Sequence, residues 1–234
     1  MIEVGIALLA AGAYALRYVI GRISFWRERR KYIEQERKYI EQLEKMDAAY
    51  HPEKPDVVVA LKCREYLAEI FPYGIKERTQ SMSNEELVAL FHQVEKDAEK
   101  IMDVEVGTVD FYVTDEPPAC TSCGLYNHKE NSLRINAAFI LSGNPVLVEE
   151  QIYTLFHELK HARQWAAVEG KHRGTKDYGY SDEQIRVWSE NFDHYIPFLV
   201  SDEWYRKQPV EHDAFGFETI LKGERQFEVV WKKL

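Results

Sequence analysis

The sequence predicts an α+β fold in which a small mixed or antiparallel sheet packs on one long helix. Residues 108–115 alternate apolar and polar side chains, as a half-buried strand does, and 132–136 shows a shorter pattern of the same kind. From Asn144 to about Gly170, apolar residues recur at helical spacing, with Pro145 at the start of the segment. We expect an apolar N-terminal helix and a charged helical stalk to precede this domain.

The composition is that of a globular protein, with 45% hydrophobic and 29% charged residues. At 234 residues, the chain is long enough for one domain with an appendage and too short for two large domains. The formal net charge of -9 argues against a nucleic-acid partner. Cys120 and Cys123 form a CxxC in a chain with three cysteines, and this usage favours a reducing compartment over secretion.

The N-terminus is apolar and is followed by basic residues. Residues 4–16 carry no charge, and the stretch reaches the roughly 20 residues of a spanning helix only by including Arg17, which could extend toward the headgroups. A basic cluster then follows at residues 27–31. Residues 1–25 are therefore predicted to be a membrane anchor, contacting the bilayer through residues 4–25, with the rest of the chain in the cytoplasm. The alternative is a soluble cytoplasmic protein whose apolar helix packs on its own core.

Residues 26–50 are predicted to form the charged helical stalk. The pentapeptide KYIEQ occurs twice with a seven-residue period, and this places Ile33, Ile40 and Leu43 on one side of a helix. The helix at 31–46 could support self-association, or it could be a solvated stalk. Two prolines in 51–56 end it, so the main domain is expected to span residues 57–234.

The main domain is predicted to open with two helices. Residues 57–71 have a helical pattern that stops before Pro72, and Ser83 with Glu86 forms a capping-box pattern at the start of the second helix. The apolar stripe of that second helix is assigned to the core: Leu87, Leu90, Phe91, Val94, Ala98 and Ile101. Residues 117–131, which lie between the two strands and contain two prolines and the CxxC, are expected to be a loop or hairpin.

The long helix carries the motif that indicates chemistry. His157 and His161 are four residues apart, so they lie about 40° apart around the helix axis. They lie nearly opposite an apolar stripe made of Val148, Ile152, Leu155, Leu159, Ala162 and Ala166. Two imidazoles on successive turns can bind one Zn²⁺ ion, and Glu158 between them can accept a proton from a water on the metal, as in HExxH sites.

A third ligand has to come from another part of the chain. Downstream of His161, Glu211 begins a Glu-x-x-Ala, and the small Ala214 one turn later allows that helix to approach the first closely. Glu211 is therefore the predicted third metal ligand. It could instead be a surface glutamate favoured at a helix start. Four other residues remain alternatives as ligand: Asp213, Glu218, Glu190 and His194.

These two segments resemble the HExxH…ExxA plan of gluzincin-type zinc metallopeptidases. The chain is similar to compact bacterial and phage domains of the ImmA/IrrE type, in which E-x-(E/D)-A-x-x-F follows, here Glu211, Asp213, Ala214 and Phe217. The resemblance covers roughly residues 108–220. It implies a zincin-like domain that hydrolyses peptide bonds and binds an extended peptide along an edge strand at 131–136. It also implies a donor to the oxyanion, for which Tyr205 is favoured over Tyr178, Tyr180, His172 and His194.

Two further interpretations remain open. The chain could be a zincin-fold binding or regulatory module with metal but little turnover, or a zinc amidase acting on a non-protein acyl substrate. The intact Glu158 favours an enzyme, since metal binding alone does not need a general base. Cys120 and Cys123 are expected to be plain loop cysteines, with a second metal site completed by His128 and Cys63, or a redox role, as alternatives.

Overall fold

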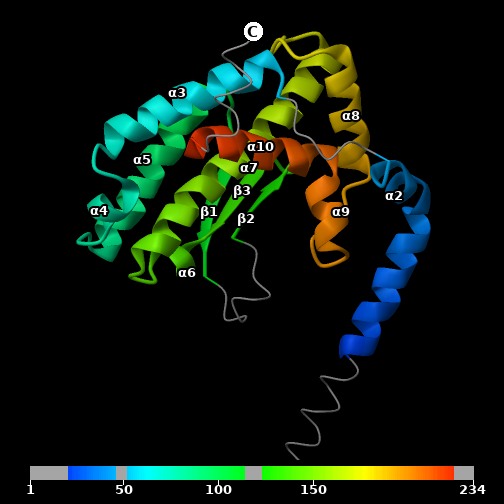
Figure 1. Cartoon of the computed structure of the whole chain (residues 1–234), viewed down its shortest axis with the longest axis horizontal. Helices are drawn as coiled ribbons and strands as arrows, with labels where there is room; N and C mark the ends of the chain where they lie inside the picture. Colours follow the sequence, from blue (N-terminus) through cyan, green and yellow to red (C-terminus); the bar gives the residue numbers. More distant parts are fainter. Residues whose placement is uncertain (1–20, 46–51, 114–122, 224–234) are drawn as a thin grey trace, which may run out of the picture. The chain divides into compact units, whose positions relative to one another are not determined.

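The computed structural model of the protein describes residues 21–45, 52–113 and 123–223 (Figure 1). The chain divides into two compact units. The larger unit contains Ala49–Asp193 and Pro209–Leu234, and the smaller contains Met1–Ala48 and His194–Gln208. The sequence places residues 194–208 within the main domain, whereas their contacts group them with the N-terminal part of the chain.

The larger unit contains a three-stranded mixed sheet in the order β1-β3-β2. Strand β1 (Thr108–Tyr112) pairs parallel with β3 (Ser132–Asn136), and β2 (Gly124–Asn127) pairs antiparallel with β3. The prediction of an edge strand at 131–136 is therefore wrong, because β3 has a neighbour on each side. Of the segment predicted as a loop or hairpin, residues 124–131 form the strand β2 and the turn that leads into β3, so β2 covers the second edge of β3.

The helices of the larger unit agree with the predicted order, and several bounds differ. Helix α3 begins earlier than predicted, with Pro55 in its first turn, and α5 begins with the predicted capping box of Ser83 and Glu86. Helix α7 continues one turn beyond Gly170 and ends at Gly174, which adopts the left-handed conformation. The bounds are α3 Lys54–Ile70, α4 Ile75–Thr79, α5 Asn84–Met102, α6 Ala137–Ile140, α7 Pro145–Arg173, α8 Asp182–Asp193 and α10 Pro209–Lys222.

Helix α7 is the centre of the larger unit. It contacts β2 and β3, and the helices α4, α5, α6, α8 and α10 also pack on it (Figure 1). Five residues of its predicted apolar stripe are buried, while Ala166 is half-buried and the next residue, Ala167, is buried in its place. The side that carries His157 and His161 is buried as well. A helix enclosed on all sides in this way gives its side chains little freedom to move, which suits a site that needs fixed geometry.

The smaller unit has its own apolar core. Residues 21–35 are helical, a bend at Glu36 separates them from α2 (Arg37–Leu43), and α9 (Asp202–Lys207) follows later in the chain. The core consists of Tyr39, Ile40, Leu43, Ile196 and Val200, with Ile33 among the side chains packed against it. The predicted apolar side of the stalk thus packs on residues of its own chain. Self-association through this helix stays a prediction.

The predicted membrane-anchored localisation is corrected by the structure. None of the helices within residues 21–45, 52–113 and 123–223 combines the length and the apolar character needed to cross a bilayer. Most of the predicted anchor, residues 1–20, lies outside the described residues. The described part of the predicted anchor, residues 21–25, is helical, and the helix continues through the arginines of residues 27–30.

Candidate metal centre

Two histidines of α7 and one glutamate of α10 converge on a common point inside the larger unit. The Nε2 atom of His157 lies 3.1 Å from Oε2 of Glu211, and Nε2 of His161 lies 3.2 Å from Oε1 of the same carboxylate. The three ligand atoms all lie within 4.8 Å of one another. Ligands bound tetrahedrally to zinc at 2.0–2.1 Å would be separated by about 3.3 Å. The arrangement could therefore hold a metal ion with little movement.

The start of α10 explains why Glu211 faces the histidines. Pro209 begins the helix, and the backbone N–H of Val210 donates to Oδ1 of Asn191 at 2.9 Å, which ties the first turn to α8. Ala214 is fully buried where α10 meets its neighbours, and its small side chain permits the close packing that the sequence predicts. Glu211 thus projects from a turn that is held by the hydrogen bond of Val210 and by the packing of Ala214.

Burial and opposite charge both shape the electrostatics of the three ligands. Glu211 is 1% exposed; its burial favours the neutral form, but His161 and His157 hold the pKa of this carboxyl well below its usual range. Burial lowers the pKa of His157, but hydrogen bonds to Glu211 and Glu218 outweigh it and raise this pKa to about 10. The carboxylates of Glu211 and Glu218 therefore favour positive charge at the ring of His157.

One buried atom of the ligand set lacks a hydrogen-bond partner, as expected at a site that binds a metal ion. The Nε2 atom of His161 is buried and has no hydrogen-bond partner, although it lies 3.2 Å from Oε1 of Glu211. A buried polar atom without a partner is costly unless something outside the chain satisfies it. A cation between this nitrogen and the Glu211 carboxylate would satisfy both.

The alternative ligands are engaged elsewhere. Glu218 binds the other ring nitrogen of His157, with 3.4 Å from Oε2 to Nδ1, and pairs with Lys222 at 2.6 Å. Asp213 pairs with Lys160 at 2.7 Å. Glu190 is paired with Arg186 on the surface of α8, and His194 of the smaller unit is bound to Glu36. Among the predicted carboxylates, Glu211 is the one that joins both histidines.

Glu158 lies between the two helical turns of the histidines and strand β2. It is buried, and its Oε2 accepts a hydrogen bond from the backbone N–H of Tyr126 at 2.8 Å. Burial raises the pKa of the Glu158 carboxyl, while the neighbouring histidines oppose this shift. A Cβ atom at Gly124 would stand 2.8 Å from Cγ of Glu158, so only glycine allows β2 to approach this closely. No pattern in the sequence indicates the contacts of Gly124 and Tyr126 with Glu158.

In the larger unit, the two tyrosines predicted as oxyanion donors form hydrogen bonds with other groups. Tyr178 donates to the carbonyl of Asp103, and Tyr180 donates to the carboxylate of Asp56. His172 is exposed in the last turn of α7. Tyr205 belongs to the smaller unit, where its ring packs edge-on against Tyr195 and Phe198. The role of Tyr205 stays a prediction.

The cysteines form no second metal cluster within residues 21–45, 52–113 and 123–223. Cys63 is fully buried, and its burial raises the pKa of the thiol to about 12. His128 packs its ring against Trp165 and Phe192. Cys123 is a free thiol beside Gly124, and Cys120 lies outside the described residues.

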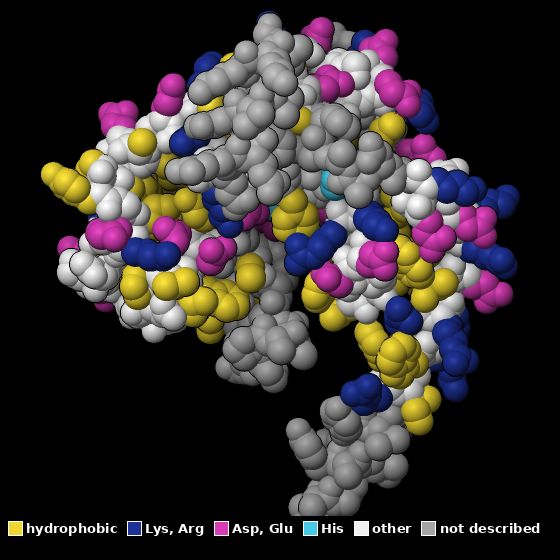
Figure 2. Space-filling model, viewed as in Figure 1, with side chains coloured by type: hydrophobic (Ala, Val, Ile, Leu, Met, Phe, Trp, Pro, Cys, Tyr) yellow, Lys and Arg dark blue, Asp and Glu magenta, His cyan; other side chains and the backbone are white. Residues whose placement is uncertain are grey.

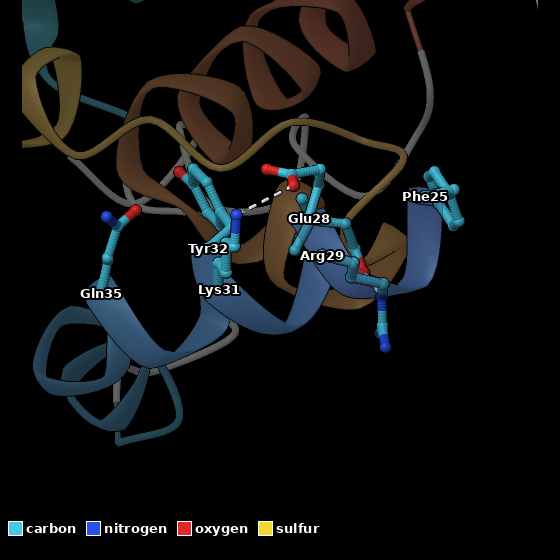
Figure 3. A pocket seen from close by; sticks show the side chains of 7 residues that line it. Phe25, Glu28, Arg29, Lys31, Tyr32 and Gln35 are labelled. Atoms are coloured by element: carbon cyan, nitrogen blue, oxygen red, sulfur yellow. Dashed lines mark hydrogen bonds and ion pairs between the residues drawn. The ribbon is translucent and has the colours of Figure 1, made fainter. Parts of the chain in front are cut away.

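The smaller unit contains an open pocket of about 470 Å³ (Figure 3). Its wall combines aromatic rings with charged side chains, among them an ion pair of Lys31 with Glu28 at 3.1 Å. The lining residues are Phe25, Glu28, Arg29, Lys31, Tyr32, Gln35 and Val200. None of them is a predicted site residue.

No protein-family model, no curated protein and no solved structure matches this chain. Fold and site together define an α+β protein with a buried cluster of two histidines and a glutamate that could hold a metal ion. On the face seen in Figure 2, basic and acidic side chains are interspersed over the described surface.

Proposed function

We propose that the protein is a zinc-dependent metallopeptidase, as its gluzincin-like motifs imply. The observation that carries the proposal is the convergence of His157, His161 and Glu211 next to a buried Glu158. A site that only stores or senses a metal has no need of a fourth, proton-accepting group that is excluded from the ligand set.

The donor set favours zinc among the common metals. Two imidazole nitrogens and one carboxylate leave a fourth tetrahedral position open, which is the pattern of catalytic zinc sites. Magnesium and calcium prefer sites made of oxygen ligands, so two histidines argue against them.

Glu158 would transfer protons in the reaction, as a general base and then as a general acid. When bound, a zinc ion would supply a Lewis acid that brings the pKa of a coordinated water toward about 7. Glu158 would accept a proton from the attacking water molecule and donate a proton to the leaving amine. Its anchoring to the N–H of Tyr126 leaves Oε1 for this task, and burial raises its pKa, which suits a group that must both accept and release a proton.

Strand β2 is the best place for an extended peptide substrate. It is an outer strand of the sheet as described, and it lies against α7 at Glu158. A peptide that adds to this edge would form main-chain hydrogen bonds and pass the metal cluster at a fixed distance. The substrate strand is thus assigned to 124–127, in place of the central strand at 132–136.

The proposal is tested on the purified full chain. We expect about one zinc per molecule and hydrolysis of an unfolded protein such as casein, both lost on treatment with a chelator. Glu158→Gln should keep zinc and lower the rate by about 10²–10⁴-fold, the usual contribution of a general base. Glu169→Gln makes the same change on a solvent-facing part of α7, where Glu169 pairs with Arg173, and should have no effect.

Two results would contradict the proposal. A chain that takes up no zinc, or loses none when His157 is changed to alanine, would remove the metal site. Zinc uptake with no hydrolysis of any peptide or acyl substrate, and no effect of Glu158→Gln, would leave a metal-binding module instead.

A further inference from the structure

Gln164 lies one turn beyond His161 on α7 and is fully buried. Its side-chain amide makes three hydrogen bonds. Oε1 lies 2.9 Å from Nδ1 of His161, and Nε2 donates to the carbonyl of Val210 at 3.0 Å and to Oδ2 of Asp213 at 2.9 Å. Gln164 therefore connects a predicted metal ligand on α7 to the turn of α10 that carries Glu211.

The partners of this amide determine which way it points. The Val210 carbonyl and the Asp213 carboxylate accept hydrogen bonds, so the NH₂ group of Gln164 must face them. The opposite orientation would place Oε1 against two acceptors in a buried site, at the cost of unpaired polar groups. Oε1 is thus directed at His161.

This orientation decides the protonation of the histidine ring. Because Oε1 of Gln164 can only accept, Nδ1 of His161 must carry the proton. The lone pair of the neutral ring is then on Nε2, the atom 3.2 Å from Glu211 that has no hydrogen-bond partner. A histidine binds a metal through a lone pair, so the hydrogen bond at the other nitrogen prepares His161 for ligation.

A buried ion pair holds the far end of this chain of contacts. Lys160 is fully buried, and its Nζ lies 2.7 Å from Asp213 and 2.7 Å from Asp56 of α3. The same ammonium group lies 4.5 Å from the ring centre of Trp188. This buried ammonium group ties Asp213, and with it the first turn of α10, to α3. The network therefore runs from α3 through Lys160, Asp213 and Gln164 to His161.

We propose that Gln164 is a positioning residue of the metal centre, which sets the tautomer and the ring orientation of His161 before the metal arrives. It is not a ligand and it does not touch the substrate. The inference rests on the proposed function only for the identity of the metal, since the tautomer is a property of the metal-free chain.

The test compares Gln164→Met with Gln151→Met. Methionine keeps the length of the side chain and removes its hydrogen bonds. Gln151 is a matched control, because it is also buried on α7 and hydrogen-bonded, but its Nε2 donates to the carbonyl of Cys123. Both variants and the unchanged full chain are labelled with ¹⁵N-histidine. Ring spectra of the metal-free proteins give the tautomer of His161, assigned through His161→Asn, and competition with a chelator gives the affinity for zinc.

Gln164→Met should lose the preference for a proton on Nδ1 of His161 and should bind zinc about 10- to 100-fold more weakly. Gln151→Met should keep both properties. A folded Gln164→Met protein with the unchanged tautomer and affinity would overturn the proposal, and so would an equal loss in Gln151→Met.

Asp213→Ala serves as the second variant if Gln164→Met does not fold. It removes one of the two acceptors that orient the amide, and it should weaken the Nδ1–H preference and zinc binding. An unchanged tautomer and affinity in Asp213→Ala would refute the role of the network. Failure of the proposed function is seen separately, as a lack of zinc uptake or of hydrolysis by the unchanged chain.

Discussion

Replacing Gly124 by alanine adds one methyl group at the contact between β2 and Glu158, the proposed general base. The new Cβ would stand 2.8 Å from Cγ of Glu158, 2.9 Å from Cγ2 of Thr154 and 3.1 Å from Oε1 of Glu158. Ordinary contacts of a Cβ begin at 3.4 Å, so strand and helix would have to separate by about 0.6 Å. The hydrogen bond from Tyr126 to Glu158, now 2.8 Å, would lengthen by a similar amount.

The displacement should lower the rate of hydrolysis without changing the affinity for zinc. Overpacking of this kind costs about 1–3 kcal/mol of the free energy of unfolding. A misplacement of about 1 Å can cost roughly 100-fold in rate, so a shift of this size should lower the rate of hydrolysis about 10- to 100-fold. Zinc affinity should stay unchanged, because Glu158 is not among the ligands.

The assay measures hydrolysis per zinc-loaded molecule, together with zinc content and melting temperature. Gly107→Ala is the control, because its Cβ would also be crowded, 3.1 Å from the carbonyl oxygen of Asn131, without touching Glu158. Gly107→Ala should lower the melting temperature and leave the rate of hydrolysis unchanged. A full rate in Gly124→Ala, or an equal loss of rate in Gly107→Ala, would refute the placement of Glu158 against β2.

Three further predictions concern the metal and the buried network. Glu218→Gln should weaken zinc binding by about 10- to 100-fold in a chelator competition, since the carboxylate that orients His157 is lost; an unchanged affinity would exclude this role. Zinc at about 100 times its dissociation constant should stabilise the fold by about 2.7 kcal/mol, visible as a higher melting temperature that His157→Ala abolishes. Burial raises the pKa of Asp56 to about 6, with Asp213 adding to the shift and Lys160 opposing it. The folded chain then keeps a proton that the unfolded chain releases near 3.8, so the free energy of unfolding of the metal-free protein should fall as pH rises from 3.8 to 6. Asp56→Asn should remove that part of the fall in denaturant titrations, and an identical pH profile in the variant would contradict the shift.

Local patterns predicted the parts of the fold that depend on neighbouring residues. The capping box at Ser83 and Glu86, strand β3 and the start of α7 at Pro145 follow from spacings of a few residues, and the structure contains all three. The limits of α3 and α7 were less accurate, because a helix end depends on what packs against it as well as on its own residues.

Strand order could not be read from the same patterns. Residues 132–136 carry the signal of a strand, but nothing in that signal says how many strands pair with it. The pairing of β2 with β3 depends on a hairpin whose turn includes Asn131 in a left-handed conformation. The grouping of residues 194–208 with α2 could not be read from local patterns either. Ile196 and Val200 contact Tyr39 and Leu43 from a distant part of the chain, so these contacts form only when the long intervening segment brings its ends together.

The sequence by itself determined the pair of histidines and the glutamate between them. A spacing of four residues on a helix places two side chains on one side regardless of the rest of the chain. Tertiary structure decided the remainder of the site. It brought Glu211 to the imidazoles of His157 and His161, and it placed Glu218 at the second nitrogen of His157. Both contacts join α10 to α7, so their geometry is set by the packing of the two helices, which no local spacing encodes. Gln164 is only three residues from His161, but its amide is oriented by Val210 and Asp213 of α10.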